Sequence, residues 1–521
     1  MTIKVYDWLA HHARRTPGKL AQRDLSSGRS FTYAQMDARA GRLAAWLRGP
    51  AGLARGDRVA VLSHNSTDVF DLQFGCAKAG TVFVPLNWRL AVPELEFIVN
   101  DCTPTVLFYS TEFADEAAGL AERCGLAALV ELDPAGRPDS AFERLLAGQP
   151  EARPHEEMVH DDLHTIMFTS GTTGHPKGAM ITYGMCFWNA VNLGGPAHVT
   201  AGTCHLAVLP LFHTGGLNCY ANVVFHAGGT VLVMRSFDPG EALRLLLDRA
   251  AGVTHFFGVP SHYQFISLQP DFEAADFSHL TICGVGGAPC PVPVIELYGQ
   301  HGVAMQQGYG MTETSPTVLV LDAADGITRA GSTGLPALHT EVRLVDEAGQ
   351  DVTEPGAIGE IWVKGPNVTP GYWNRPEANR ASFTDGWLHT GDAARFDADG
   401  FYYVVDRWKD MFISGGENVY PAEVENVLAR LPQLAEVAVI GVPDDKWGEV
   451  GMAVAVLKAG ASIDEGEVLR HCGANLARFK VPKSVRFVPA LPRNATGKVL
   501  KRVLRDDVAA APDTAAVSAA G

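Results

Sequence analysis

The sequence predicts an α/β protein, in which a large N-terminal domain of parallel sheets carries a small antiparallel β subdomain and precedes an α+β C-terminal domain. Residues 58–62 and 81–85 are short apolar runs on either side of a helical stretch at 65–79, which is the pattern of a βαβ unit. Both runs are apolar throughout, as in parallel strands that are covered on both faces. The length of 521 residues exceeds what one compact core holds, which indicates more than one domain.

The alternation of strand and helix extends over most of the N-terminal domain. Residues 1–50 contain two helices with apolar positions at helical spacing, the second of them over 34–47. The further expected elements are strands at 105–109, 205–209, 230–234, 253–257 and 281–283, and helices at 217–225 and 241–250.

The pattern changes from about residue 330 onward. Short strands separated by glycine and proline, at 341–345, 359–364 and 400–405, indicate the antiparallel subdomain. A compact α+β set follows, with helices at 423–430 and 464–476 and strands at 436–441, 452–457 and 485–488. We therefore predict an N-terminal domain over 1–406, a C-terminal domain over 407–507 and a disordered, low-complexity tail over 508–521.

Composition limits the possible partners and the cellular setting. The net charge of −16 disfavours a nucleic-acid surface, which demands a basic face. The nine cysteines include no C-x-x-C pair, so neither a zinc site nor a disulfide framework is indicated. The N-terminus lacks the apolar core of a signal peptide, and no apolar run approaches the length of a membrane span. We expect a cytoplasmic protein, whose oligomeric state stays open, a homodimer included.

A glycine-rich loop between two expected strands is the strongest local signal. Residues 168–178 read Phe-Thr-Ser-Gly-Thr-Thr-Gly-His-Pro-Lys-Gly, and the strands lie at 164–168 and 179–181. Glycines let successive amides turn inward, and the hydroxyls and Lys177 add donors for a polyphosphate. The loop fails the G-x-x-x-x-G-K-[ST] template, because Pro176 replaces the second glycine and Gly178 follows the lysine. A kinase-type P-loop is therefore disfavoured.

Residues 169–178 resemble the signature loop of the acyl-adenylate-forming (ANL) superfamily, which includes acyl-CoA synthetases, adenylation domains of peptide synthetases and luciferases. Four further blocks follow in the order typical of that family: 306–313 (Gln-Gln-Gly-Tyr-Gly-Met-Thr-Glu), 387–392 (Trp-Leu-His-Thr-Gly-Asp), 406–410 (Asp-Arg-Trp-Lys-Asp) and 491–498 (Leu-Pro-Arg-Asn-Ala-Thr-Gly-Lys). Any one block could arise by chance, but their joint order identifies the chain as similar to acyl-CoA synthetases. In overall texture it resembles the bacterial fatty acyl-CoA and the feruloyl- or coumarate-type CoA ligases.

The resemblance implies that a carboxylic acid reacts with Mg·ATP to give an acyl-AMP. It places Tyr309 on the adenine, Asp392 and Arg407 on the ribose, and Lys498 between the carboxylate and the α-phosphate. Mg²⁺ would be held by Glu313 and Thr173. The residues implied to bind ATP are Thr169, Ser170, Gly171, Thr172, Thr173, Gly174, Lys177, Gly287, Ala288, Pro289, Gln307, Gly308, Tyr309, Gly310, Thr312, Asp392, Arg407 and Lys498, and those implied to be catalytic are Thr173, His213, Glu313 and Lys498.

Coenzyme A is the expected acceptor of the acyl group. In the resembled ligases the C-terminal domain is mobile and rotates about a hinge, here Lys409, between the two half-reactions. The residues implied to bind CoA are Ser414, Gly415, Gly416, Glu417, Trp447, Phe479 and Lys483. The acyl pocket is assigned to His213, Gly216, Leu217, Gly284, Gly308 and Met311, in which the glycines are expected to leave space. These walls contain no Asp, Lys or Arg, so we expect an apolar fatty or aromatic acid such as a hydroxycinnamate.

Three other functions compete with this interpretation. An acyl-AMP ligase that loads a carrier protein would use the same adenylation residues but would not turn over free CoA. A phosphotransferase or ATPase would need the loop in a different register and a helix directly after it. A catalytically silent binding scaffold would not need Glu313, Asp392, Arg407 and Lys498 together.

Overall fold

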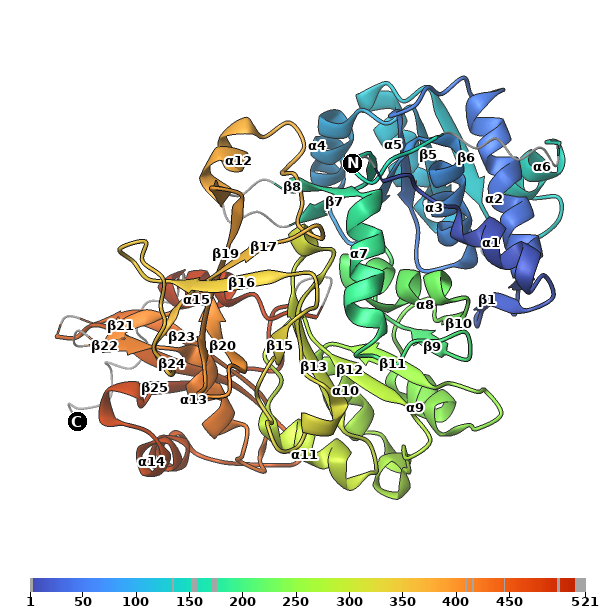
Figure 1. Cartoon of the computed structure of the whole chain (residues 1–521). Helices are drawn as coiled ribbons and strands as arrows, with labels where there is room; N and C mark the ends of the chain where they lie inside the picture. The colour runs from blue at the N-terminus through green and yellow to red at the C-terminus, as the bar shows by residue number, and fades with distance from the viewer. Residues whose placement is uncertain are drawn as a thin grey trace.

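The computed structural model describes residues 3–133, 135–150, 157–169, 176–407, 410–414, 417–444, 446–493 and 497–510. These residues form four sheets, and the predicted α/β class is confirmed. Figure 1 shows the N-terminal sheet and its helices at one end of the molecule and the C-terminal domain at the other, with the small antiparallel sheet between them. The nine cysteines all lie within the described residues, and none forms a disulfide.

The first sheet confirms the predicted βαβ unit and the strands on either side of the glycine-rich loop. Its strand order is β6 (Ala128–Leu132), β5 (Val106–Ser110), β3 (Arg58–Leu62), β4 (Val82–Leu86), β7 (Leu163–Thr169) and β8 (Lys177–Thr182). All neighbouring strands are parallel except β7 and β8, which are antiparallel and pair Thr169 with Lys177. The glycine-rich loop therefore connects two adjacent strands at the edge of the sheet.

The second sheet has nine strands and joins segments that are far apart in the chain. Its order is β15 (Leu335–Pro336), β14 (Thr317–Val320), β13 (Met305–Gly310), β12 (Ile282–Val285), β11 (His255–Gly258), β9 (Cys204–Ala207), β10 (Thr230–Val233), β1 (Leu20–Asp24) and β2 (Ser30–Thr32). The pairing of β1 with β10 was not expected from the sequence. The six central strands, from β13 to β1, pair in parallel. Strands β14 and β15 at one end and β2 at the other pair antiparallel.

Two smaller sheets complete the fold. The antiparallel subdomain contains β16 (Glu341–Val345), β17 (Gly359–Lys364), β18 (Phe383–Thr384), β19 (Trp387–Phe396) and β20 (Tyr402–Arg407). The C-terminal sheet contains β21 (Phe412–Ser414), β22 (Glu417–Val419), β23 (Leu434–Asp444), β24 (Gly448–Leu457) and β25 (Ser484–Phe487). Only β25 joins it in parallel, next to β24.

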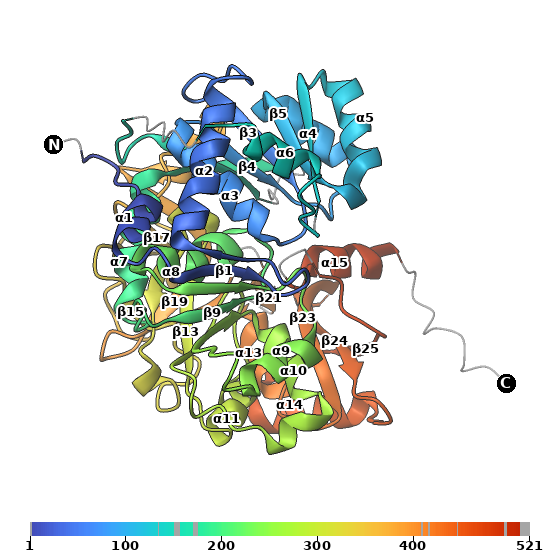
Figure 2. The same cartoon turned by 90° about the vertical axis from the view of Figure 1, so that its right-hand side faces the viewer.

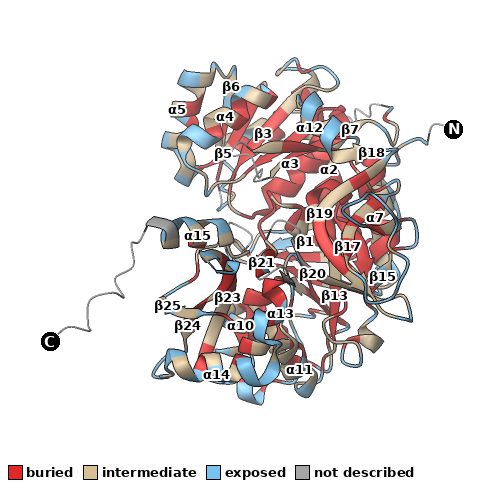
Figure 3. Ribbon diagram, turned by 90° about the vertical axis from the view of Figure 1, so that its left-hand side faces the viewer, coloured by how far each residue is buried: buried red, intermediate tan, exposed pale blue. Residues whose placement is uncertain are grey.

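Helices cover the sheets, and the apolar faces of the helices pack against the strands. They are α1 (Trp8–Arg15), α2 (Tyr33–Arg48), α3 (Thr67–Ala79), α4 (Val92–Cys102), α5 (Ala114–Cys124), α6 (Ala141–Ala147), α7 (Tyr183–Gly194), α8 (Asn222–Ala227), α9 (Pro239–Leu247), α10 (Pro260–Ser267), α11 (Val292–Gln300), α12 (Pro376–Ser382), α13 (Pro421–Leu428), α14 (Glu465–Asn475) and α15 (Lys501–Ala510). Figure 3 shows buried strands and exposed outer faces on helices such as α5 and α15. No described helix is both long and apolar enough to cross a bilayer.

The boundaries of some elements differ from the expected ones. Helix α15 continues to Ala510, three residues into the stretch assigned to the tail, and residues 511–521 lie outside the described residues. Figure 2 shows α15 beside the C-terminal sheet, near the end of the chain. Helix α2 begins where its sequence dictates: the Thr32 hydroxyl accepts a hydrogen bond from the Gln35 amide, and the Gln35 side chain accepts one from the Thr32 amide.

A buried cluster of charges links the helices of the N-terminal sheet. Arg39 on α2 donates to Asp71 on α3 at 2.6 Å and to Glu143 on α6 at 2.7 Å. Arg29 binds Asp68, also on α3, at 3.0 Å. Burial raises the pKa of Asp68 to about 6, although both arginines favour its ionised form. The positive charges of the two arginines therefore offset the desolvation free energy of the buried carboxylates, which would be large without them.

We expect Arg39→Ala to lower the free energy of unfolding by about 3–5 kcal/mol, because it leaves buried carboxylates with too little compensating charge. Urea and thermal unfolding, followed by circular dichroism, would measure the change. Arg244→Ala is the control, because its pair with Glu241 is exposed and is worth about 1 kcal/mol or less. Equal effects for the two variants would contradict the assignment.

Candidate active site

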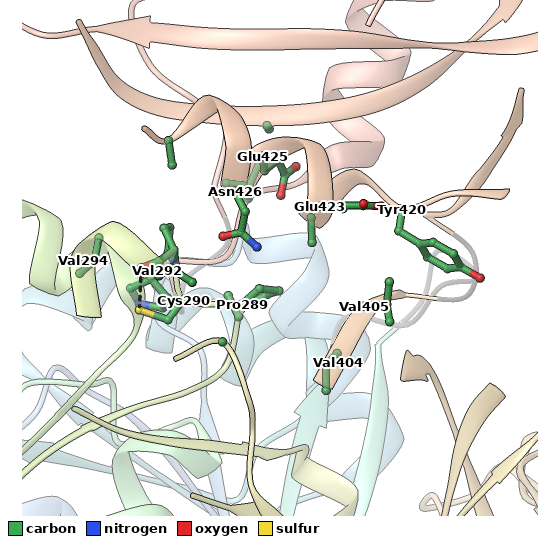
Figure 4. A pocket seen from close by; sticks show the side chains of 18 of the residues that line it. Pro289, Cys290, Val292, Val294, Val404, Val405, Tyr420, Glu423, Glu425 and Asn426 are labelled. Carbon is green, nitrogen blue, oxygen red and sulfur yellow. Dashed lines mark hydrogen bonds between the residues drawn. The ribbon is translucent and has the colours of Figure 1, made fainter. Parts of the chain in front are cut away.

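A cavity of about 1560 Å³ separates the N-terminal domain from the C-terminal domain. Its walls come from the loop after β12, from β13, from β19 and β20, and from the C-terminal domain. In Figure 4 the side chains of Glu423, Glu425 and Asn426, on α13, lie opposite Pro289 and Val292. The volume exceeds that of an ordinary pocket for one small ligand, so the cavity has room for a nucleotide.

Many of the residues predicted to bind ATP meet in this cavity. They come from both domains and from four separate stretches of the sequence. The lining includes Gly287, Ala288, Pro289, Gln307, Gly308, Tyr309, Gly310, Met311, Asp392 and Lys498, together with Phe479 from the predicted CoA group. Thr312 and Glu313 follow Met311 on a short 3₁₀-helix (Thr312–Thr314) and are buried.

Tyr309 and Asp392 contact each other directly on this wall. The Tyr309 hydroxyl donates a 2.7 Å hydrogen bond to Asp392 Oδ2, which orients the carboxylate. Asp392 pairs with Arg407 across β19 and β20, so the two residues predicted at the ribose stand opposite each other. Only the backbone of Arg407 is described.

Lys498 reaches the cavity through a loop that rests on the N-terminal domain. Gly497 has a φ of +82°, and a Cβ placed on it would lie 3.0 Å from Ser261 Oγ and 3.1 Å from a Val259 methyl. The Arg493 guanidinium donates to the Gly497 carbonyl and also binds Glu436 at 2.6 Å. The positive φ favours glycine here, and the close approach of the two domains leaves little room for a Cβ.

Only the two ends of the glycine-rich loop lie among the described residues. Ser170, Gly171, Thr172, Thr173 and Gly174 lie outside the described residues. The Thr169 hydroxyl donates to the Lys177 carbonyl at 3.3 Å, which closes the base of the loop. The Lys177 ammonium lies 5.3 Å from the centre of the Tyr372 ring, and the Tyr372 hydroxyl donates to Glu313 at 2.7 Å. The predicted phosphate and magnesium residues are thus connected through a tyrosine that the sequence analysis missed.

His213 is held as a neutral ring by a hydrogen bond and by burial. Its Nδ1 accepts a 3.2 Å hydrogen bond from the Gly215 amide, which leaves the proton of the neutral ring on Nε2. Burial lowers the pKa of His213 to about 4. Phe257, which is partly exposed, lies within 4 Å of positions that a Cβ would occupy on Gly215, Gly284 and Gly286. Of the glycines predicted to line the acyl pocket, Gly284 is the one that lies beside Phe257, whereas Gly216 meets Pro210 and Gly308 meets Leu319.

The expectation that these glycines leave open space is wrong for Gly216 and Gly284. A Cβ on Gly284 would lie 2.9 Å from the Tyr220 hydroxyl and 3.0 Å from the Phe257 ring. A Cβ on Gly216 would lie 2.2 Å from the Pro210 carbonyl oxygen. Both glycines therefore permit close packing. The expected helix at 217–225 is correspondingly split into a π-helix (Gly215–Ala221), which contains the buried Leu217, and α8.

The structure brings only some of the residues predicted to bind CoA together on the C-terminal domain. Ser414 pairs with Gly448, which places the 42% exposed Trp447 beside the β21–β22 hairpin. Phe479 lies on a 3₁₀-helix (Arg478–Lys480) and reaches the large cavity, whereas Lys483 is exposed. Lys409, Gly415 and Gly416 lie outside the described residues, and Glu417 is described by its backbone alone.

Two functional candidates, Phe257 and Tyr372, were missed for the same reason. Each acts on residues that are distant in the sequence, such as Glu313, which is 59 positions from Tyr372. Only their position inside short Gly-containing segments, Phe257-Gly258 and Gly371-Tyr372, hinted at close packing.

Comparisons with known proteins find relatives over nearly the whole chain. The family model described as AMP-binding enzyme matches residues 9–373, and the model of its C-terminal domain matches 423–498. The chain is 44% identical over 498 residues to a feruloyl-CoA synthase of an Amycolatopsis species, which covers 96% of this chain and 98% of that protein. It is 38% identical over 517 residues to a long-chain-fatty-acid–CoA ligase of Mycobacterium tuberculosis, which covers 98% and 99%.

A solved structure shows the same fold over nearly the whole chain. The crystal structure of ATP-bound MatB from Rhodopseudomonas palustris has a TM-score of 0.88 and 35% identity, and the match covers 96% of this chain and 98% of that one.

We expect His213 to stay neutral from pH 8 down to pH 5, because burial disfavours the imidazolium and lowers the pKa to about 4. Histidine ring NMR signals, assigned with His213→Gln, would show no inflection for His213 in that range. A midpoint near the ordinary value of 6.5 would contradict the described environment.

Proposed function

The chain belongs to the AMP-binding enzyme family and is an acid–CoA ligase, and from this premise we propose that it works in two steps through an acyl-adenylate. In the first step a carboxylate oxygen attacks the α-phosphorus of ATP, and pyrophosphate leaves. In the second step the thiol of CoA attacks the acyl carbon, which releases AMP and a proton and leaves the acyl-CoA thioester. AMP is needed because the oxide of a free carboxylate is a poor leaving group.

The observation that carries the proposal is the single cavity that brings Tyr309, Asp392 and Lys498 together from two domains. In this cavity the nucleotide base would lie against Tyr309 and the backbone at 287–289, and the ribose would bind Asp392. Lys498 would then stand where the carboxylate and the α-phosphate meet, and would stabilise the charge that develops on phosphorus. ATP and CoA are the expected co-substrates.

Mg²⁺ fits the donors that the site offers. Among the described residues, no group of three or more His, Cys, Asp or Glu side chains is arranged as a metal site. This agrees with a cation that is bound by one or two protein oxygens and mainly by substrate phosphates. The buried Glu313 carboxylate and the Thr173 hydroxyl would provide those oxygens, and the ion would neutralise phosphate charge.

The substrate we propose is an apolar acid with an aromatic ring. The partly exposed Phe257 gives the acyl side a flat aromatic wall, and Tyr220 stacks behind it at 5.2 Å and 22°. The Nε2–H of neutral His213 can donate to the carboxylate without adding a charge. The name of the feruloyl-CoA synthase relative favours a hydroxycinnamate as the first acid to test, with fatty acids as the alternative.

The second step needs the CoA group to reach the acyl-adenylate. Among the described residues, Lys498 lines the cavity, whereas Ser414 and the 42% exposed Trp447 do not. We therefore propose that the C-terminal domain turns about Lys409 between the two steps, which withdraws Lys498 and brings Ser414, Trp447 and their neighbours to the site.

Pyrophosphate release with Mg·ATP, measured with and without CoA over a panel of acids, tests the whole proposal. The panel contains short, medium and long fatty acids, benzoate, phenylpropanoate, coumarate and ferulate. We expect CoA-dependent turnover with the aromatic acids. Release that stops at about one equivalent per enzyme, whether or not CoA is present, would indicate a carrier-loading ligase instead. No release with any acid would overturn the adenylation proposal.

We expect Lys498→Ala to slow adenylation by about 100-fold or more, because it removes a charge that acts in the transition state. Thioester formation from a supplied acyl-AMP should stay within about threefold of the unmodified enzyme, because Lys498 has left the site in that step. Lys364→Ala, on the exposed side of β17, is the matched control. Equal losses in both half-reactions would contradict the assigned role.

A further inference from the structure

One tyrosine contacts both charged residues that flank the phosphate region. The hydroxyl of Tyr372 donates a 2.7 Å hydrogen bond to Glu313 Oε1, and the face of its ring lies 5.3 Å from the Lys177 ammonium. Tyr372 is 9% exposed and Glu313 is 5% exposed, so this hydrogen bond is shielded from water. A charge-assisted hydrogen bond in such surroundings is strong and directional.

The backbone around Tyr372 is fixed by neighbouring groups. The Asn379 side chain accepts a hydrogen bond from the Tyr372 amide at 2.6 Å and donates one to its carbonyl at 3.1 Å. Tyr372 also forms a β-bridge with Ala179 on β8, the strand that begins at Lys177. The ring is therefore held against the strand that leaves the glycine-rich loop.

The Glu313 backbone is fixed by the same segment. Its carbonyl accepts a 2.7 Å hydrogen bond from the Thr369 amide, and the Thr369 hydroxyl donates to the Met180 carbonyl at 2.6 Å. Residues 369–373 thus connect β8 to the 3₁₀-helix that carries Glu313. Both the backbone and the carboxylate of Glu313 are attached to one short segment from the antiparallel subdomain.

We propose that Tyr372 is a positioning residue for the divalent cation: its hydroxyl fixes the orientation of the Glu313 carboxylate, so that the carboxylate is ready to receive a cation bound to the nucleotide phosphates. This inference rests on the proposed function. A carboxylate that is free to rotate loses conformational entropy when it binds a cation. A hydrogen bond to one of its oxygens orders the carboxylate beforehand and so lowers the entropic cost of binding. A phenylalanine would fill the same volume and would keep the ring contact with Lys177, so the role belongs to the hydroxyl.

The test measures cation affinity and does not depend on turnover. Mn²⁺ binding is followed by electron paramagnetic resonance in the presence of an ATP analogue with a methylene group in place of the α–β bridging oxygen. We expect Tyr372→Phe to raise the Kd of Mn²⁺ about tenfold, the size expected when a hydrogen bond to a charged group is lost. Binding of the analogue without metal should change less than about twofold, because the phosphate contacts remain.

Two further variants separate positioning from a general effect on packing. Asn379→Ala releases the Tyr372 backbone and should weaken Mn²⁺ binding in the same direction. Tyr298→Phe removes another buried hydroxyl, which donates to the Tyr263 carbonyl at 3.0 Å, and should leave the Kd of Mn²⁺ unchanged. In a Glu313→Gln background, Tyr372→Phe should have no additional effect, because both changes act on the same carboxylate.

An unchanged Kd of Mn²⁺ in Tyr372→Phe would overturn the inference, and so would an undiminished effect in the Glu313→Gln background. An equal loss in Tyr298→Phe would reduce the role of Tyr372 to packing and would also overturn it. Failure of the proposed function looks different, because the unmodified protein would then release no pyrophosphate with any acid while its Mn²⁺ binding could still be measured.

Discussion

The contact between Gly497 and the start of α10 determines which chemical groups share the cavity. Because Gly497 has no side chain and a positive φ, its loop can approach Val259 and Ser261 so closely that a methyl group would already be tight. This approach brings Lys498 to the same cavity as Tyr309 and Asp392. This contact therefore helps to set the position of the Lys498 charge relative to that of Asp392.

The same closeness gives a physical reason why the two proposed half-reactions would need two arrangements of the domains. A lysine that bridges two anions must stand at the reacting atoms, and the sulfur of CoA must later reach the acyl carbon at the same place. Among the described residues, Ser414 and Trp447 do not line the cavity that Lys498 enters. The proposed rotation of the C-terminal domain would resolve this conflict without a second cavity, since one surface would leave the acyl carbon as another arrives.

The sequence predicts best where chemistry is local. The strands around the glycine-rich loop, the βαβ unit and the gathering of Tyr309 with Asp392 follow from short patterns or from motif order. It predicts poorly where contacts join distant segments, such as β1 with β10 or Tyr372 with Glu313, because no local period encodes such pairs. The role of a glycine cannot be predicted from the sequence alone. A glycine can leave a pocket open or, as at Gly284, allow two segments to pack tightly.

The residues proposed for the acyl side would favour an acid whose only charge is the reacting carboxylate. Burial keeps His213 neutral, and Phe257 and Tyr220 add aromatic carbon to the same region. A second carboxylate or an ammonium on the substrate would leave water without gaining a charged partner from these residues, which carries a large free-energy cost. In the proposed mechanism the reacting carboxylate would avoid this cost, because it would meet Lys498 and be consumed by adenylation. If these residues line the acyl pocket as proposed, selectivity for apolar acids would follow from the lack of compensation that they offer to any other charge.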